Sequence, residues 1–349
     1  MLRHHPRAAL LLAAALLAVT AIGALGAGAV QIAPGEVVGW IGWKLGLGGT
    51  APDDMTDAVL GAVRVPRVMM GMVAGAGLAA AGVLMQAFFR NPLADPALIG
   101  VASGGALGAV AIIVLGATLF EGLVGLLGAL ALPLAAFAGS LLTTLLVYGL
   151  ARRDGLVDAS TMLLAGIAVN AIAAAGIGLL TFIATDTQLR NLTFWTLGSL
   201  SAADWGAFAT VAPAVLAILV AVPVLAGPLN ALLLGDAEAR HLGIRVEPLK
   251  RLILVLTCVA AAAVVSAAGV IGFVGLIAPH LARLMVGPDH RFMLPLAVVL
   301  GAVLLLAADT LARILVAPAE LPLGVLTALV GGPLFLWLLR RARGTLFHA

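Results

Sequence analysis

The stretch Val68-Met-Met-Gly-Met-Val-Ala-Gly-Ala-Gly-Leu-Ala-Ala-Ala-Gly-Val-Leu-Met85 decides the fold class of this chain. It contains eighteen consecutive residues without a charge, and an apolar helix of that length matches the hydrocarbon thickness of a bilayer. Its many Gly and Ala residues also point to lipid, where close packing of helix backbones drives association. We therefore expect a transmembrane helix over residues 62–88.

The rest of the sequence has the same character. Of 349 residues, 63% are hydrophobic and only 10% are charged, and the mean hydropathy is +1.18. Soluble domains carry about 25% charged residues, because their surface must be hydrated. We predict an all-α polytopic membrane protein with a single transmembrane domain over residues 1–349. The expected spans are 8–30, 62–88, 97–118, 123–150, 160–184, 206–230, 252–272, 273–286, 292–316 and 323–339.

Two of these ten spans have particular features. Residues 273–286 are too few to cross a bilayer comfortably, so we expect a partial helix buried by its neighbours. The first span follows the basic residues of Met1–Arg7, as the apolar part of a secretory signal peptide would. Its apolar stretch is longer than usual for a signal peptide, which favours a retained helix; cleavage would leave nine spans.

The positive charges predict the orientation of the chain. When loops are assigned to alternate sides, fourteen of the 19 Lys and Arg residues fall on one side. Cytoplasmic loops of membrane proteins carry such an excess, so both termini are expected inside. The basic pI has this origin, and we expect no nucleic-acid partner. The five cations expected outside are Lys44, Arg64, Arg67, Arg190 and Arg313.

The chain carries no ATPase motif. A phosphate-binding P-loop needs Gly-x-x-x-x-Gly-Lys-Ser/Thr, and the only lysines are Lys44 and Lys250, which lack that context. We therefore expect a transport subunit that is not itself an enzyme. An ion-driven transporter, the alternative of another class, needs ionisable groups deep in its spans, and these spans are nearly bare of them apart from Asp309. An intramembrane enzyme would need convergent polar groups, and His280 has no evident companion.

The cytoplasmic segment 233–248 predicts a short surface helix. Asp236 is expected to cap it and to pair with Arg240, while Gly243 is expected to stop it in a left-handed conformation. Acids precede bases along the segment, which complements the helix dipole. Such a short helix needs a packing partner. From the residues alone, an ordinary ordered loop and a helix that docks on another subunit both remain open.

Several long motifs in order resemble one known family, the permease subunits of ABC importers for iron-siderophores, haem and vitamin B12. They extend through nearly the whole chain. The matching stretches are Arg64–Arg67 (RVPR), Gln86–Pro96 (QAFFRNPLADP), Ile99–Gly105 (IGVASGG), Phe194–Leu200 (FWTLGSL), Gly235–Ile244, Gly272–Arg283 (GFVGLIAPHLAR), Ala308–Arg313 (ADTLAR) and Glu320–Pro333 (ELPLGVLTALVGGP).

The resemblance implies an assembly in the cell inner membrane. It would contain two permease subunits as a homodimer around one pathway, two cytosolic ABC ATPase subunits and a periplasmic substrate-binding protein. In this family the loop between the sixth and seventh spans couples to the ATPase. The resemblance therefore assigns that role to Asp236, Glu238, Arg240, His241, Leu242 and Gly243.

The resemblance also assigns a role to three outer arginines. Arginines at the positions of Arg64, Arg67 and Arg313 meet glutamates of the binding protein in this family, and a guanidinium suits bidentate capture of a carboxylate. Two other interpretations remain open. The side chains could extend to the lipid interface, and Arg313 could pair with Asp309 one turn earlier on the same helix.

Substrate and pathway are less constrained by the residues. Arg190, Gln86 and Met85 are candidates for the translocation path, Arg190 because a cation would favour an anionic chelate. No clustered metal-ligand set occurs, so we expect no metal site and no cofactor on this chain. The stretches 163–170 and 188–198 look most like the haem-importing branch. We expect haem as the substrate, with ferric siderophore or cobalamin as alternatives.

Overall fold

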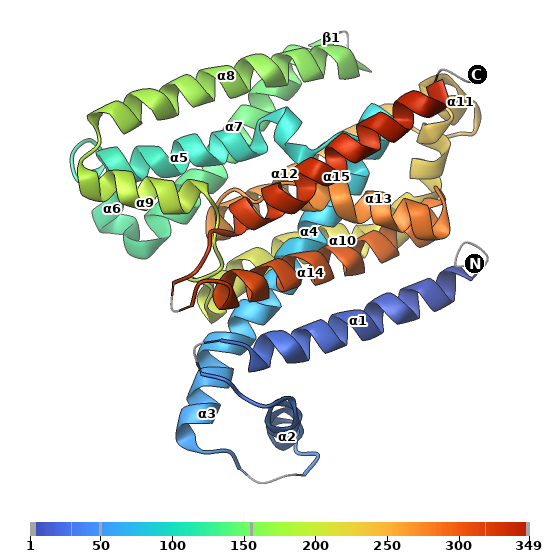
Figure 1. Ribbon diagram of the computed structural model, residues 1–349. Helices are drawn as coiled ribbons and strands as arrows, with labels where there is room; N and C mark the ends of the chain where they lie inside the picture. Colours follow the sequence, from blue (N-terminus) through green and yellow to red (C-terminus); the bar gives the residue numbers. More distant parts are fainter. Residues whose placement is uncertain (1–4, 29, 49–50, 154–155, 318, 347–349) are drawn as a thin grey trace.

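The computed structural model describes residues 5–28, 30–48, 51–153, 156–317 and 319–346, and it is almost entirely helical (Figure 1). Its elements in chain order are α1 (Pro6–Gly26), α2 (Pro34–Lys44), α3 (Asp54–Ala58), the π-helical turn η2 (Val59–Arg64), α4 (Val65–Phe89), the 3₁₀ turn η3 (Pro96–Ile99), α5 (Val101–Leu115), α6 (Glu121–Leu127), the 3₁₀ turn η4 (Gly128–Leu130), α7 (Ala131–Ala151), β1 (Arg152–Arg153), β2 (Leu156–Val157), α8 (Ala159–Ile183), α9 (Asp186–Thr196), α10 (Trp205–Leu233), α11 (Asp236–His241), α12 (Val246–Ala268), α13 (Val274–Val286), α14 (His290–Ile314) and α15 (Leu323–Leu346). The two short strands pair antiparallel between α7 and α8.

The expected spans are confirmed as helices. Seven helical segments are long and apolar enough to cross a membrane, and three shorter apolar helices, α5, α13 and part of α15, account for the other expected spans. The eighth span is α13, with 13 residues. At about 1.5 Å per residue it covers roughly 20 Å, less than the hydrocarbon core of about 30 Å. Most of its apolar residues are buried, as expected for a partial helix.

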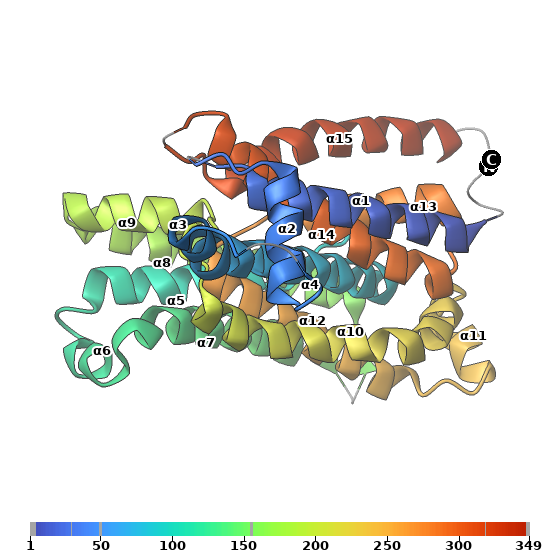
Figure 2. The same ribbon diagram turned by 90° about the horizontal axis from the view of Figure 1, so that it is seen from below.

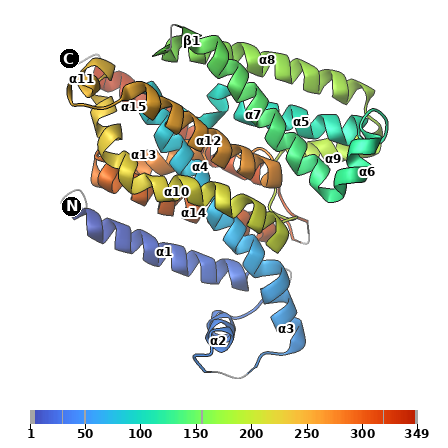
Figure 3. The same ribbon diagram turned by 180° about the vertical axis from the view of Figure 1, so that it is seen from behind.

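Helix α4 forms the centre of the bundle. It packs against α10, α12, α13 and α14 and runs between them in all three views (Figure 1, Figure 2, Figure 3). In its most apolar stretch 83% of the residues are buried, compared with 17% for α8 and 22% for α1. On one side lie α5, α7, α8 and α9, while α1 packs on α14 at the other.

Glycine pairs let these helices approach closely. A Cβ on Gly82 of α4 would lie 2.0 Å from the carbonyl oxygen of Gly275 on α13. One on Gly75 would lie 2.3 Å from the carbonyl oxygen of Gly301 on α14. Only glycine fits such contacts, which are the means by which lipid-embedded helices gain packing energy. The glycines of the opening stretch therefore place α4 between α13 and α14.

The ends of the bundle agree with the expected orientation. The start of α1, the whole of α11 and the end of α15 lie together at one end of the molecule (Figure 1, Figure 2). The opposite end carries α9, together with α2 and α3 below the bundle in Figure 1. We refer to the end with α11 as the inner end. Two amphipathic helices, α2 and α9, were not among the sequence predictions because neither has the length or composition of a span.

The glycine contacts give a stability prediction. Gly82→Ala should destabilise the chain by about 1–3 kcal/mol, because the added methyl forces α4 and α13 apart. Thermal unfolding of the purified chain in detergent measures this effect. Gly149→Ala is the matched control, since a Cβ there meets nothing within 4 Å and alanine favours the helix. Equal melting temperatures for the two variants would contradict the packing assignment.

Candidate functional site

A buried cluster of charges lies at the outer end of the bundle. Arg67 on α4 donates to both oxygens of Asp309 on α14, with a shortest distance of 2.9 Å, and to Glu320 at 2.9 Å. Asp309 is fully buried and Arg67 is 8% exposed. Arg67 therefore joins α4, α14 and the segment before α15 through charge-assisted bonds, which are the stronger class of hydrogen bond.

Two further arginines hold the end of α1. Arg64 donates to the carbonyl oxygens of Leu25 and Gly26, at 2.5 and 2.9 Å, and to that of Val30. Arg313 donates to the carbonyl oxygens of Ala24 and Ala27, at 3.0 and 2.9 Å. The last carbonyls of a helix have no partner within the helix, and cations there complement its dipole. The two guanidinium groups thus cap α1 from α14 and from the turn before α4.

All three arginines therefore have internal partners in this structure. Arg64, Arg67 and Arg313 are between 5% and 8% exposed. The internal pair weighed for Arg313 is present, with its Nε 3.2 Å from Asp309. The acid Glu320 is the accessible member of the cluster, with 37% of its side chain exposed. Docking of a binding protein on these arginines remains a prediction.

The inner segment forms the expected short helix, α11, but two of its predicted contacts are wrong. Gly235, at φ +116°, is the N-cap, and Asp236 makes no capping bond. Asp236 pairs with Lys250 of α12 at 2.5 Å rather than with Arg240, whose partner is Glu247 at 3.5 Å. The next helix supplied partners that outweighed the local i,i+4 pair.

Most other side chains of α11 are exposed to solvent. Ala239 is the buried residue of α11, and the helix packs against α10 and α12. Glu238, Arg240 and His241 are exposed, and Leu242 directly after the helix is 63% exposed. Gly243 has φ +83°, so the left-handed stop is confirmed. The helix thus displays acid, base and apolar groups together at the inner end.

The three pathway candidates differ in their positions. Met85 and Gln86 on α4 are 0% and 3% exposed, so both are buried within the single chain, and their place on the path remains a prediction. Gln86 donates to the carbonyl oxygen of Gly275 at 3.3 Å and accepts from Arg283 at 2.8 Å, which ties α4 to α13.

In the neighbouring loop, burial raises the pKa of the Asp95 carboxyl.

Arg190, by contrast, is exposed on α9 near the outer end. The helix begins with a reciprocal capping box between Thr185 and Gln188. Phe194 follows one turn after Arg190 and is 58% exposed. Residues four apart share one face of a helix, so α9 presents a cation beside an aromatic ring.

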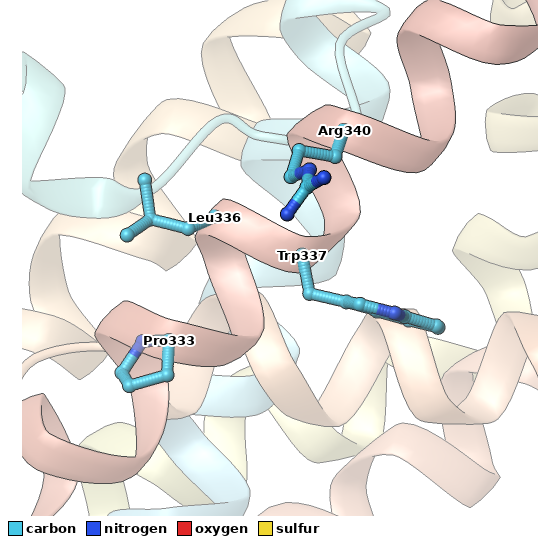
Figure 4. A pocket seen from close by; sticks show the side chains of 4 residues that line it. All are labelled: Pro333, Leu336, Trp337 and Arg340. Atoms are coloured by element: carbon cyan, nitrogen blue, oxygen red, sulfur yellow. The ribbon is translucent and has the colours of Figure 1, made fainter.

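Several helices leave apolar faces uncovered, among them α8 and α15. On α8, Leu164, Ile172 and Leu179 are 68–71% exposed. On α15, an open hollow of about 660 Å³ is lined by Pro333, Leu336, Trp337 and Arg340 (Figure 4). Leu336 and Trp337 point away from each other along α15 in this view. Over the part of the chain that the structure describes, no group of three or more His, Cys, Asp or Glu could hold a metal ion.

Known proteins are similar to this chain in sequence and in fold. A model of the FecCD transport family matches residues 16–341. The hemin transport system permease protein HmuU of Yersinia pestis is 46% identical over 281 residues, which cover 80% of this chain and 83% of the relative. The cobalamin import system permease protein BtuC of Halobacterium salinarum is 40% identical, with 82% and 74% covered. The vitamin B12 import system permease protein BtuC of Klebsiella pneumoniae is 38% identical, with 94% and 92% covered.

A solved structure agrees with these relatives. The inward-facing conformation of a putative metal-chelate type ABC transporter has a TM-score of 0.81 and 32% identity, and the match covers 95% of this chain and 98% of that one. The resemblance expected from the motifs is thereby confirmed over nearly the full length. This chain belongs to the FecCD transport family of ABC importer permeases.

Proposed function

We propose that this permease carries haem inward across the cell inner membrane. Permeases of this family serve importers of the haem, vitamin B12 and siderophore class, and ATP is hydrolysed by a separate subunit. The observation that carries the haem assignment is the 46% identity to the hemin permease, against 40% and 38% for the cobalamin permeases. Exposed Arg190 beside Phe194 supports it, because a cation next to an aromatic ring suits a flat, anionic macrocycle.

An ion-driven mechanism finds less support. A coupling ion needs an ionisable group that is free to bind and release it at membrane depth. Asp309 is the acid that the sequence offered, and it is engaged by Arg67 and Arg313 at the outer end of α14. A carboxylate held by two guanidinium groups is already compensated, so it has little affinity for a further cation.

We also propose that two copies of the chain assemble around one pathway. The exposed apolar faces of α8 and α15 are candidates for this contact, since α8 is the least buried of the long helices and α15 carries an exposed hollow. Trp337 and Leu336 would then face a pathway or the partner copy. The proposed ATPase contact is α11 at the inner end, and the proposed binding-protein contact is the outer end near Arg64, Arg67 and Arg313.

The substrate is tested by reconstitution. The permease with its ATPase in liposomes, supplied in turn with binding proteins loaded with haem, a ferric siderophore or cobalamin, should accumulate haem at a rate at least tenfold above the others. Arg190→Glu should lower haem uptake several-fold, because it places an anion where an anionic substrate enters. Preferred uptake of cobalamin would assign the chain to the other branch of the family.

The coupling role of α11 gives a second prediction. Arg240→Ala and Gly243→Val should each lower uptake at least tenfold. For Arg240→Ala, the melting temperature of the isolated chain should stay nearly unchanged. Gly243→Val adds backbone strain, because a β-branched residue is disfavoured at positive φ. Uptake and ATP hydrolysis of the assembled complex are the measurements. Arg291→Ala is the control, since Arg291 is also exposed at the inner end but lies on α14. Normal uptake by Arg240→Ala would remove α11 from the coupling route.

The buried charge cluster gives a third prediction. Arg67→Ala should destabilise the chain by about 3–5 kcal/mol, because it leaves Asp309 buried without its main partner. Adding Asp309→Asn should restore most of that loss, since the amide carries no charge to compensate. Thermal unfolding in detergent compares the single and the double variants. A double variant no more stable than Arg67→Ala would contradict the pairing.

The same double variant separates docking from stability. If Arg67 also binds a carboxylate of the binding protein, the refolded double variant should bind that protein at least tenfold more weakly than a variant with Asp309→Asn alone. Affinity can be measured by surface plasmon resonance on detergent-purified complex. Equal affinities would restrict Arg67 to its internal role.

A further inference from the structure

A narrow groove lies on the side of the bundle between α7 and α12. These two helices pack against each other and are both visible in Figure 3. The cavity has a volume of about 230 Å³. Its walls are almost entirely apolar, with Leu141 and Leu145 on α7 and Val255 and Val259 on α12. This is less than the roughly 300–1,000 Å³ of a small-molecule site. Its size and chemistry suit one hydrocarbon chain.

The groove has a polar end at the inner side of the membrane. Tyr148 lies one turn before the inner end of α7, and Arg251 lies in the second turn of α12, which starts at the same end. From Arg251 to Val259, α12 rises about 12 Å. That distance reaches from the inner boundary of the hydrocarbon core nearly to its middle, since the core is about 30 Å thick.

Arg251 has no carboxylate partner among the described residues. Its side chain is exposed, and the nearest acid along the helix, Glu247, is directed elsewhere. Glu247 is 3.5 Å from Arg240 and accepts from the backbone N–H of Val157 at 3.3 Å. The guanidinium of Arg251 therefore lies at the mouth of an apolar groove without a carboxylate partner among the described residues.

We propose that this groove binds an anionic phospholipid of the inner leaflet. One acyl chain lies between α7 and α12, and the phosphate is held by Arg251. A planar guanidinium suits bidentate contact with a phosphate, and basic pockets between transmembrane helices on the cytoplasmic side are typical sites for anionic headgroups. The ring of Tyr148 lies at the depth where amphipathic aromatic side chains meet the membrane interface.

Native mass spectrometry of the detergent-purified chain tests this site. Dioleoyl phosphatidylglycerol and dioleoyl phosphatidylcholine are titrated separately, so that only the headgroup charge differs. The wild type should bind one phosphatidylglycerol about fivefold more tightly than phosphatidylcholine, as expected for one basic residue at the surface. Arg251→Gln should abolish that preference. Val255→Trp should weaken binding of both lipids, because the indole fills the groove while the charge is kept.

Matched variants distinguish this site from general effects. Arg291→Gln removes another exposed inner arginine, and Leu216→Trp adds an indole at another position that is 58% exposed; both should bind lipid like the wild type. Loss of the preference in Arg291→Gln would overturn the site in favour of net charge. Conversion of a dimer to a monomer by Val255→Trp would also overturn it, because the groove would then belong to an interface between copies. Retained preference in Arg251→Gln would exclude the assigned phosphate contact.

Discussion

The close approach of helix backbones around α4 is the constraint on which the rest of this structure depends. In lipid there is little hydrophobic drive between helices, so contact area has to come from interlocking backbones. Gly75 and Gly82 bring α14 and α13 to distances that no side chain would allow. With α4 fixed in this way, its outer end places Arg67 beside Asp309 and its inner end places Gln86 beside Arg283. The charged contacts at both ends of α4 therefore depend on the uncharged glycine contacts between them.

This arrangement separates the molecule into a packed core and two kinds of surface. Helices α4, α12 and α14 carry most of the burial, whereas α8 and the exposed part of α15 are left with apolar faces. Short helices lie at the two ends of the bundle, α11 at one end and α9 beside α5 at the other. A permease needs such a division, because the parts that meet partners have to move without loosening the core.

The sequence was sufficient to predict the membrane spans but not the amphipathic helices α2 and α9 or the side-chain partners. Apolar runs located the spans, three of them as shorter helices, and the φ of Gly243 followed from a glycine placed after a short charged helix. Local rules were wrong for Asp236, because Lys250 on the following helix offered a better partner than Arg240. The bond from Arg67 to Glu320 joins residues 253 positions apart, and no periodicity in a single sequence connects such positions. The burial of Arg64, Arg67 and Arg313 was missed for the same reason.

The capping of α1 has a consequence for the order in which the chain is made. Its final carbonyls receive one guanidinium from Arg64, 39 positions after Leu25, and another from Arg313, 286 positions after Ala27. During synthesis the first of these partners emerges soon after α1 itself, whereas the second emerges only with α14. Until then the carbonyl oxygens of Ala24 and Ala27 lack the guanidinium that they accept from in the finished fold. Full capping of the first helix therefore has to wait until α14, the last helix but one, has been made.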